Sequence, residues 1–497
     1  MAWRQKSYRH KLAVMGDSMG QGFKNGGIYR TDLSFPAMLS RCFAPPAPFN
    51  IPSFSAQGGI PLNLEVMVRG LSDRFGNRIS LRQTIPAVWH LYKTLRRIKQ
   101  HWETRTGPII GTPDIPWHNQ AIWGFAANDT WLISDKICRA YLNENKNRYS
   151  IFNVLPNHAM YITGRMVLNP SLSPEQENHT QLDNIKQLHQ DGGIENLIVC
   201  VGHNNFIGAL TALDISYSNP KHMDSPHFKR NYTVYRPEHF EKEMKHLFEK
   251  VATMSIPRVY VPTYPYATIP PVTRGINEGR APHKGGYFDY YTRFWIWDED
   301  FDPDKNPHLT REKAIELDQL VDRYNEIVRS LAAEYGFIVV PAHKYINAVA
   351  RRRLGVDAAR PYPPRFVDAL KRNPMTSHLV NPNGGVRLST DYIRVDQETR
   401  KITTGGIFSL DGLHPTTVGY GLVANIYYMT MKDAGTQFEQ PLDWDWILNE
   451  DTLISDPPYL LTELRLLLRF LSMGRQERFT RVGQGMLQQL LDLFTRR

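Results

Sequence analysis

The sequence predicts an α/β protein built on a doubly wound, mostly parallel sheet. Five short apolar or β-branched runs have the length and composition of buried parallel strands. These runs are Leu12–Met15, Ala121–Trp123, Leu197–Val201, Arg258–Val261 and Phe337–Val340. Helical patterns between the runs predict layers of helices against the sheet.

Three helices are the easiest to place. Their apolar residues recur at helical spacing over Pro237–Met254, Thr310–Tyr335 and Thr417–Met431. Thr310 and Lys313 flank the expected N-cap turn of the second of these helices. Strands that alternate with helices in this way favour parallel pairing over antiparallel pairing.

The composition excludes several other classes of protein. The chain has 497 residues, of which 41% are hydrophobic and 22% are charged, unlike disordered, collagenous or coiled-coil chains. This length allows three domains or one large decorated domain. No run reaches the roughly 18 apolar residues of a membrane-spanning helix, and the first residues lack the apolar core of a signal peptide. We therefore expect a cytoplasmic protein.

Cysteine usage and charge point to no cofactor. Cys42, Cys138 and Cys200 are odd in number and form no Cys-x-x-Cys pair, so neither a disulfide framework nor a zinc site is indicated. Phosphate-loop, His-Glu-x-x-His and dinucleotide fingerprints do not occur. The net charge of +10 is a modest excess in a chain of this length and does not by itself select an anionic partner. We expect no metal, no cofactor and no nucleic acid.

Two insertions interrupt a main domain that we expect to span residues 1–450. In the first, at about 60–116, helically spaced apolar residues lie opposite a basic face, which predicts a solvated surface helix. The apolar residues are Val88, Leu91, Leu95, Ile98 and Trp102, and the basic residues are Lys93, Arg96, Arg97 and Lys99. The second, at 273–307, is predicted to be irregular. It is rich in aromatic residues, namely Tyr287, Phe288, Tyr290, Tyr291, Phe294, Trp295 and Trp297, which either cap a substrate cleft or serve plain packing.

Residues 451–497 are predicted to form an amphipathic helical extension. Segments Tyr459–Met473 and Val482–Phe494 place leucines on one side and arginines elsewhere. A basic amphipathic helix can lie in a membrane interface, although packing on its own domain or on a second subunit is more common. A peripheral membrane contact through this extension is one expectation, and the oligomeric state stays open.

The strongest local motif directly follows the first predicted strand. It reads Gly16-Asp17-Ser18-Met19-Gly20, a serine flanked by glycines at a strand-to-helix turn, where its hydroxyl is exposed. The motif also fits the Gly-x-Ser-x-Gly elbow of α/β-hydrolases, but in that fold several strands precede the nucleophile. Only 17 residues precede Ser18, which argues strongly against that fold.

A serine hydroxyl becomes nucleophilic when a neighbouring base takes its proton, and a third group holds that base. Near the C-terminus, Asp411 precedes His414 by three residues on one predicted loop. Asp411 could accept the Nδ1 proton of His414 and leave Nε2 facing Ser18. This Asp-x-x-His spacing is common, so by itself it is a weak signal.

Ester cleavage also needs donors for the oxyanion that forms. Asn204 follows the strand Leu197–Val201 within Gly202-His203-Asn204-Asn205, and its amide can point across the strand ends. Gly124 closes the segment Asn119-Gln120-Ala121-Ile122-Trp123-Gly124, where a glycine lets a backbone N–H approach a substrate closely. We expect His203 to line the pocket rather than to bind a metal.

Together these motifs resemble the four blocks of the SGNH or GDSL hydrolase superfamily of serine esterases and lipases. The blocks are carried, in order, by Gly16–Ser18, Asn119–Gly124, Gly202–Asn204 and Asp411–Pro415. The resemblance implies a three-layer α/β/α flavodoxin-like sandwich with a central five-stranded sheet. It also implies that Ser18 is the nucleophile, His414 the base and Asp411 its orienting carboxylate, with Ser18 N–H, Gly124 and Asn204 as oxyanion donors.

Two features depart from the family pattern. Asn205 stands where the third block usually has aspartate, a position with mainly a local hydrogen-bonding role. More residues than usual separate Ser18 from Gly124 in the sequence, which makes Gly58 and Gly59 rivals for the second block. We favour Gly124 because the asparagine and alanine of that block precede it.

The resemblance implies a serine hydrolase that cleaves carboxylic esters, of small molecules or lipids, through an acyl-enzyme. A carbohydrate O-acetylesterase with the same catalytic residues is the alternative within the enzyme class. An inactive ester-binding or glycan-binding module of the same fold is the alternative outside it. Since histidine titrates near pH 6.5 and a base must be neutral, kcat/KM of the enzyme should rise through about pH 6 to 7.

Overall fold

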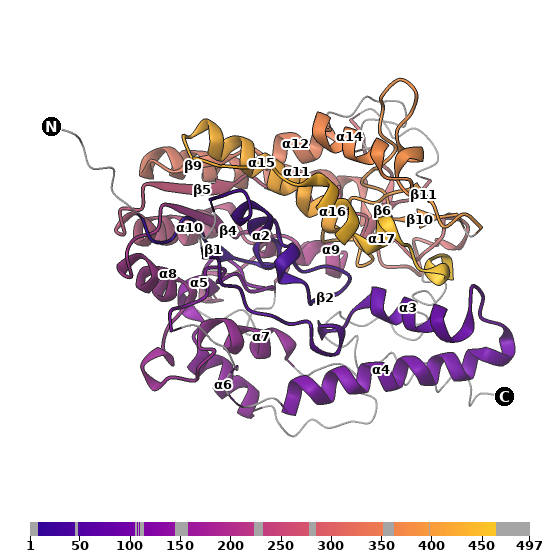
Figure 1. Cartoon of the computed structure of the whole chain (residues 1–497), viewed down its shortest axis with the longest axis horizontal. Coiled ribbons are helices and arrows are strands. Elements are labelled where there is room, and N and C mark those ends of the chain that lie inside the picture. Colours follow the sequence, from indigo (N-terminus) through magenta and orange to yellow (C-terminus); the bar gives the residue numbers. More distant parts are fainter. Residues whose placement is uncertain are drawn as a thin grey trace.

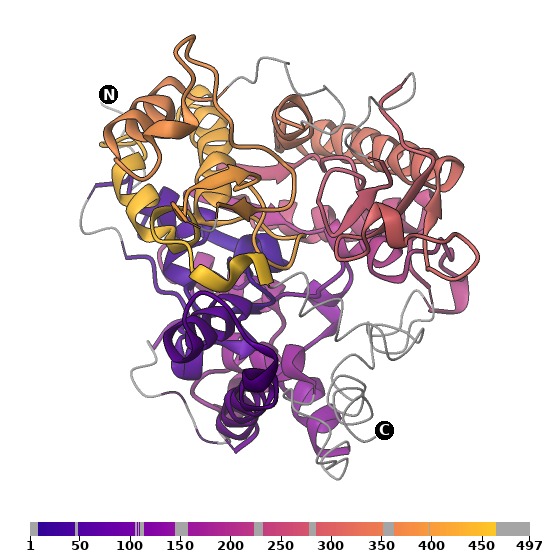
Figure 2. The same cartoon turned by 90° about the vertical axis from the view of Figure 1, so that its right-hand side faces the viewer.

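The fold is taken from a computed structural model of the whole chain. The structure describes residues 8–44, 48–104, 107, 109, 114–144, 158–222, 232–277, 285–350, 362–396 and 398–463. Figure 1 shows the described elements in sequence colours around a central sheet. Figure 2 shows elements of the C-terminal part of the described chain, in orange and yellow, beside indigo elements of the N-terminal part, so segments far apart in the sequence lie side by side.

The central sheet is parallel and has four strands. The strands are β1 (Ala13–Gly16), β4 (Asn196–Cys200), β5 (Arg258–Pro262) and β9 (Ile338–Val340). They are hydrogen-bonded in the order β1-β4-β5-β9. Four of the five predicted strands are therefore confirmed to within one or two residues.

The fifth predicted strand, Ala121–Trp123, is wrong. The preceding residues do lie along β1: Val14 N–H donates to the His118 carbonyl at 2.8 Å, and Gln120 N–H donates to the Val14 carbonyl at 2.8 Å. The Asn119 side chain, however, accepts a hydrogen bond from Ala121 N–H at 3.0 Å. Such local side-chain bonds compete with strand pairing, so the segment makes a single bridge to β1 and then turns.

Side chains that alternate along the strands enter two different hydrophobic cores, one on each face of the sheet. Val14, Ile198 and Tyr260 pack with helices α2 (Phe35–Ser40) and α15 (Thr417–Asp433). On the other face, strand residues such as Met15 and Val199 pack with three helices. These are α8 (Gln181–Gln190), α10 (Pro237–Ala252) and α11 (Arg311–Tyr335).

The three predicted helices correspond to α10, α11 and α15 and agree with them to within two residues at each end. The predicted N-cap is confirmed, because the Thr310 hydroxyl accepts a hydrogen bond from Lys313 N–H at 3.4 Å. This bond satisfies one of the free N–H groups of the first turn.

The first insertion forms a helical hairpin of α3 (Leu64–Phe75) and α4 (Thr84–Thr104). Four of the five predicted apolar positions of α4 are buried, with Val88 half-buried. Lys99 is a correction, because its side chain is buried and lies 3.6 Å from Glu103 instead of facing solvent. Beyond the hairpin, α6 (Asp135–Glu144) and α7 (Ala159–Leu168) enclose a third core together with the end of α4.

The aromatic insertion is more regular than predicted. It contains a small antiparallel sheet of β6 (Thr273–Gly275), β7 (Tyr290–Arg293) and β8 (Leu309–Thr310). Aromatic residues favour strands. Phe288 and Tyr291 are buried in the core beside α11, and Phe294 stacks on Tyr392 with ring centroids 4.3 Å apart. These three residues therefore serve packing and do not cap a cleft.

Short elements complete the described chain. The remaining helices are α1 (Ser18–Gln21), α5 (Asp129–Leu132), α9 (Gly208–Ala212), α12 (Ala342–Ala348), α14 (Pro364–Arg372), α16 (Trp444–Glu450) and α17 (Thr452–Ser455). The remaining strands are β2 (Gly27–Ile28), β3 (Ile60–Pro61), β10 (Arg394–Val395) and β11 (Ile402–Thr404).

Most of the predicted C-terminal amphipathic segments, from residue 464 onward, lies outside the described residues. Within the described part, no helix combines the length and the apolar character needed to cross a membrane.

Candidate active site

The predicted nucleophile lies at the carboxyl end of β1, where the strand turns into α1. Gly16 closes β1 with a positive φ of 144°, and a Cβ at this position would collide with the Cys200 carbonyl. Asp17 then caps α1, since its carboxylate accepts a hydrogen bond from Met19 N–H at 3.0 Å. Ser18 is thereby fixed as the first residue of α1, beside the end of β4, where open α/β sheets place their ligands.

The structure brings Ser18, His414 and Asp411 into one hydrogen-bonded chain. His414 Nε2 lies 3.0 Å from Ser18 Oγ, although 396 positions separate the two residues. His414 Nδ1 lies 3.2 Å from Asp411 Oδ2. The other carboxylate oxygen, Oδ1, accepts the N–H groups of Leu413 and His414, each at 2.8 Å, which folds the loop around the carboxylate.

Asp411 is held in its ionised form. Burial raises the pKa of this carboxyl. The charge of His414, together with hydrogen bonds from His414 and from Gly26 N–H, lowers the pKa by a larger amount, so that it lies below its ordinary value. An ionised carboxylate beside Nδ1 favours the tautomer with the proton on Nδ1. Nε2 of His414 is then the acceptor that faces the Ser18 hydroxyl.

Aromatic rings pack beside the imidazole. The Phe23 ring lies 4.6 Å from the His414 ring and 5.2 Å from the Trp123 ring, centroid to centroid. Phe23 is buried and Trp123 is half-buried. These rings hold the imidazole in place and give this side of the site an apolar wall.

Two hydrogen bonds bring the turn at Gly124 close to Ser18. Ile122 N–H donates to the Gly16 carbonyl at 3.0 Å, and Trp123 N–H donates to Gln21 Oε1 at 2.8 Å. Gly124 itself has a φ of +82°. Within the part of the chain that the structure describes, the N–H groups of Ser18 and Gly124 donate to no other protein group.

Asn204 borders the same turn from the end of β4. Its Nδ2 donates to the Phe125 carbonyl at 2.9 Å, which uses one of the two amide hydrogens. The rival glycines are differently placed. Gly58 N–H donates to the Ser55 carbonyl and Gly59 N–H to the Ala56 carbonyl, both at 3.1 Å, so neither N–H is left for an oxyanion.

The Asn205 side chain has the local hydrogen-bonding role that the sequence suggested. Its Oδ1 accepts Ala127 N–H at 3.1 Å, and its Nδ2 donates to Glu243 Oε2 at 3.4 Å. An aspartate here would set a second carboxylate against Glu243 and could not donate to it. The amide is therefore matched to this neighbour.

Asp17, Cys200 and His203 are the described residues whose spacing could hold a metal ion, with ligand atoms within 4.8 Å of one another. Hydrogen bonds already account for the pair at the centre of this group: His203 Nδ1 lies 3.0 Å from Asp17 Oδ2. Burial raises the pKa of the Cys200 thiol well above its ordinary value, which disfavours the thiolate that a metal would bind. We assign the three residues to hydrogen bonding and packing.

Sequence reasoning missed the residues that hold the Asp411 loop. Asn25 N–H donates to Ser409 Oγ, and Asn25 Oδ1 accepts Leu410 N–H, both at 3.0 Å. The neighbouring Gly26 N–H donates to Asp411 Oδ2 at 3.0 Å. The Asn25-Gly26-Gly27 sequence signals a turn, but no sequence pattern indicates contacts across more than 380 positions.

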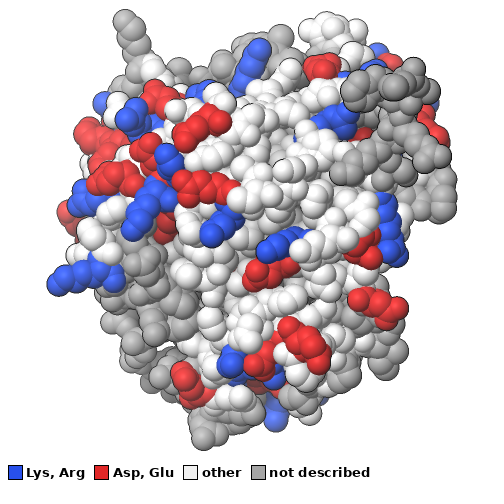
Figure 3. All heavy atoms as spheres, turned by 90° about the vertical axis from the view of Figure 1, so that its left-hand side faces the viewer, with Lys and Arg blue, Asp and Glu red and all other residues white. Residues whose placement is uncertain are grey.

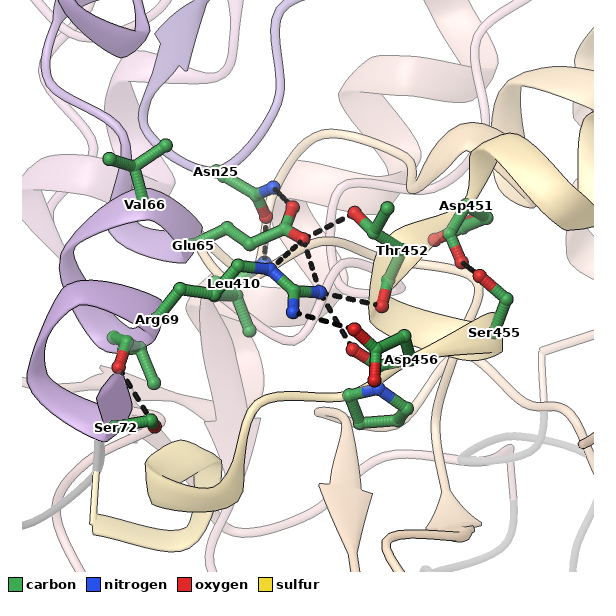
Figure 4. A network of polar contacts seen from close by, with 12 residues as sticks. Asn25, Glu65, Val66, Arg69, Ser72, Leu410, Asp451, Thr452, Ser455 and Asp456 are labelled. Carbon is green, nitrogen blue, oxygen red and sulfur yellow. Dashed lines mark hydrogen bonds and ion pairs between the residues drawn. The ribbon is translucent and has the colours of Figure 1, made fainter. Parts of the chain in front are cut away.

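A polar network, buried at Asn25 and Glu65 and exposed at Thr452 and Asp456, extends this clamp to α3 and the end of the described chain (Figure 4). Asn25 Nδ2 donates to Glu65 Oε2 at 3.0 Å, and Arg69 donates to Glu65 Oε1 at 2.9 and 3.0 Å. Arg69 also donates to the backbone carbonyls of Thr452 and Asp456, at 2.9 and 2.7 Å. The loop that carries Asp411 is thus tied to two distant segments.

For the hydrolase that the sequence predicts, Asn25→Gly is expected to lower kcat about 10-fold to 100-fold with little change in KM, because small displacements of a catalytic group, here the predicted Asp411, cost that much. Glycine accepts the positive φ of 55° at this position, so the variant removes the amide without adding backbone strain. Steady-state ester kinetics, normalised by active-site titration, measure the effect.

Asn277→Gly is the matched control, because Asn277 also has a positive φ, of 63°, but is exposed. Its kcat should equal that of the wild type. If Asn25→Gly reduced only the fraction of folded enzyme and left kcat per active site unchanged, Asn25 would be a purely structural residue.

Comparisons with known proteins give little. The chain matches no protein-family model and no curated protein. Among solved structures it is similar to a protein from Parabacteroides merdae described as a GDSL-like lipase, with 11% identity and a TM-score of 0.26. That similarity covers 87% of this chain and 99% of the other. The geometry of the chain's own residues therefore carries the functional conclusion.

Proposed function

We propose that the chain is a serine hydrolase of the SGNH or GDSL type that cleaves carboxylic esters. The observation that carries this proposal is the hydrogen-bonded chain from Ser18 through His414 to Asp411, at 3.0 and 3.2 Å. Helices against both faces of a parallel sheet support the flavodoxin-like layering of that superfamily. The order of the four sequence blocks supports it as well.

In the proposed reaction, Ser18 Oγ attacks the ester carbonyl while His414 Nε2 takes its proton. The ionised Asp411 stabilises the imidazolium that forms. His414 then gives the proton to the departing alcohol, which leaves the acyl group on Ser18. Water, deprotonated by the same imidazole, releases the acid and restores the hydroxyl.

The oxyanion of both tetrahedral intermediates is assigned to three donors. Ser18 N–H and Gly124 N–H donate to no protein acceptor in the described chain, and Asn204 retains one amide hydrogen. Donors that are fixed before the reaction cost no reorganisation when charge develops. The engaged N–H groups of Gly58 and Gly59 favour Gly124 for this role.

The apolar wall of Phe23 and Trp123 beside His414 favours an acyl chain longer than acetyl. Hydrolysis of a p-nitrophenyl ester series from acetate to palmitate tests both reaction and chain length. We expect turnover with an optimum above acetate. An acetate optimum would instead identify an O-acetylesterase, and a folded protein without turnover on any ester would favour the binding module.

A further inference from the structure

The hairpin of α3 and α4 carries much of the net charge of the chain. Residues 70–100 contain seven Lys or Arg residues against one acidic residue, Asp73, which gives a net charge of +6 out of +10 for all 497 residues. Six of the seven basic side chains are exposed, and none forms an ion pair with a described residue. They are Arg74, Arg78, Arg82, Lys93, Arg96 and Arg97.

Large apolar side chains are exposed within the same surface. Ile85 is 63% exposed and Trp89 is 55% exposed, and both lie on one side of α4 together with Lys93, at steps of four residues. Tyr92 stacks on Trp89 with ring centroids 5.2 Å apart, and Lys93 Nζ lies 5.3 Å from the Trp89 ring centre. Exposed apolar side chains that lie next to one another, unlike scattered single ones, can mark an interaction site.

The outward face is preformed because the opposite side of α4 is anchored. Leu91, Leu95, Ile98 and Trp102 are each 5% exposed or less and pack into two of the hydrophobic cores. Figure 1 shows α4 along the lower edge of the molecule with α3 beside it, so the hairpin forms a rim. On the face shown in Figure 3, by contrast, basic and acidic side chains are interspersed.

We propose that this basic face of the α3–α4 hairpin docks the protein on an anionic lipid bilayer. Lys and Arg side chains are attracted to the negative surface of anionic membranes. Tryptophan prefers the level of the lipid headgroups, and an apolar side chain such as Ile85 inserts between acyl chains. Nucleic acid would match the charge of this face, but it has no apolar layer into which the exposed Ile85 side chain could insert.

Co-sedimentation of the full chain with vesicles tests the proposal. The wild type should sediment with vesicles of phosphatidylcholine and phosphatidylglycerol, remain in solution with phosphatidylcholine alone, and be released by added salt. The triple variant Lys93→Gln, Arg96→Gln, Arg97→Gln should lose roughly a hundredfold in partitioning, since each charge contributes a factor of about five. Trp89→Ser should lower partitioning at unchanged charge.

The matched control is Lys242→Gln, Lys250→Gln, Arg329→Gln, which removes the same charge from exposed positions of α10 and α11. It should bind vesicles like the wild type, and so should Ser18→Ala, because docking needs no catalysis. The proposal is overturned if the wild type stays in solution with both vesicle types, or if the control triple binds as weakly as the test triple. Retention of an oligonucleotide without any vesicle binding would also overturn it, in favour of nucleic acid.

Discussion

Ser18→Ala is expected to reduce ester turnover by about 10⁴-fold or more, the largest effect of any single change in this chain. In the proposed reaction the hydroxyl is the group that becomes acylated, and no other nucleophile lies beside His414 among the described hydrogen-bond partners. KM should change little, because the oxyanion donors and the apolar wall remain. Initial rates on the best ester of the p-nitrophenyl series measure the loss.

Ser53→Ala is the matched control, since Ser53 is exposed and, among the described residues, its hydroxyl bonds only to that of Ser55, at 3.2 Å. Its turnover should equal that of the wild type. Ser18 and His414 act as a unit, so Ser18→Ala combined with His414→Ala should lose no more than the single variants. Additive losses would show that the two residues act in separate steps.

Asn204→Ala is expected to lower kcat about 10²-fold to 10³-fold, as removal of one oxyanion donor does in serine hydrolases. The loss should appear in kcat rather than in KM, because the oxyanion exists only in the transition state and intermediate. Steady-state kinetics on the same ester measure it.

The variant also breaks the hydrogen bond to the Phe125 carbonyl, so it needs a structural control. Asn169→Ala removes a buried amide that likewise donates to a backbone carbonyl, that of Ser173 at 2.9 Å, on the loop after α7. Both variants should unfold at lower temperature, but only Asn204→Ala should lose kcat. Equal kcat values for the two variants would contradict the role of Asn204 as a donor.

The sequence predicted the sheet well because buried parallel strands leave a strong local pattern. Continuous apolar runs such as those at β4 and β5 are short and bounded by polar loops. The Ala121–Trp123 run has the same local pattern, but the Asn119 side chain diverts the backbone, and this competition depends on three-dimensional contacts. The prediction that the aromatic insertion is irregular was wrong for a similar reason. Its strands pair with residues more than 15 positions away, and local sequence does not show such pairing.

Those residues of the candidate site that belong to short sequence motifs could be predicted from the sequence. Ser18 and His414 belong to such motifs, and their contact at 3.0 Å follows from both being at the same end of the sheet. Asn25 and Glu65 belong to no motif. They form hydrogen bonds between loops that are distant in the sequence, and only the three-dimensional structure shows which loops lie next to each other.

Covalent labelling of the full chain with a fluorophosphonate tests the central claim most directly, because this reagent phosphonylates an activated serine. Peptide mapping by mass spectrometry should find one adduct, on Ser18. The adduct should be absent from heat-denatured protein, slow to form in His414→Gln and unchanged in Ser53→Ala. An adduct on another residue, or no adduct in protein that still hydrolyses esters, would contradict the assignment of Ser18 as the nucleophile.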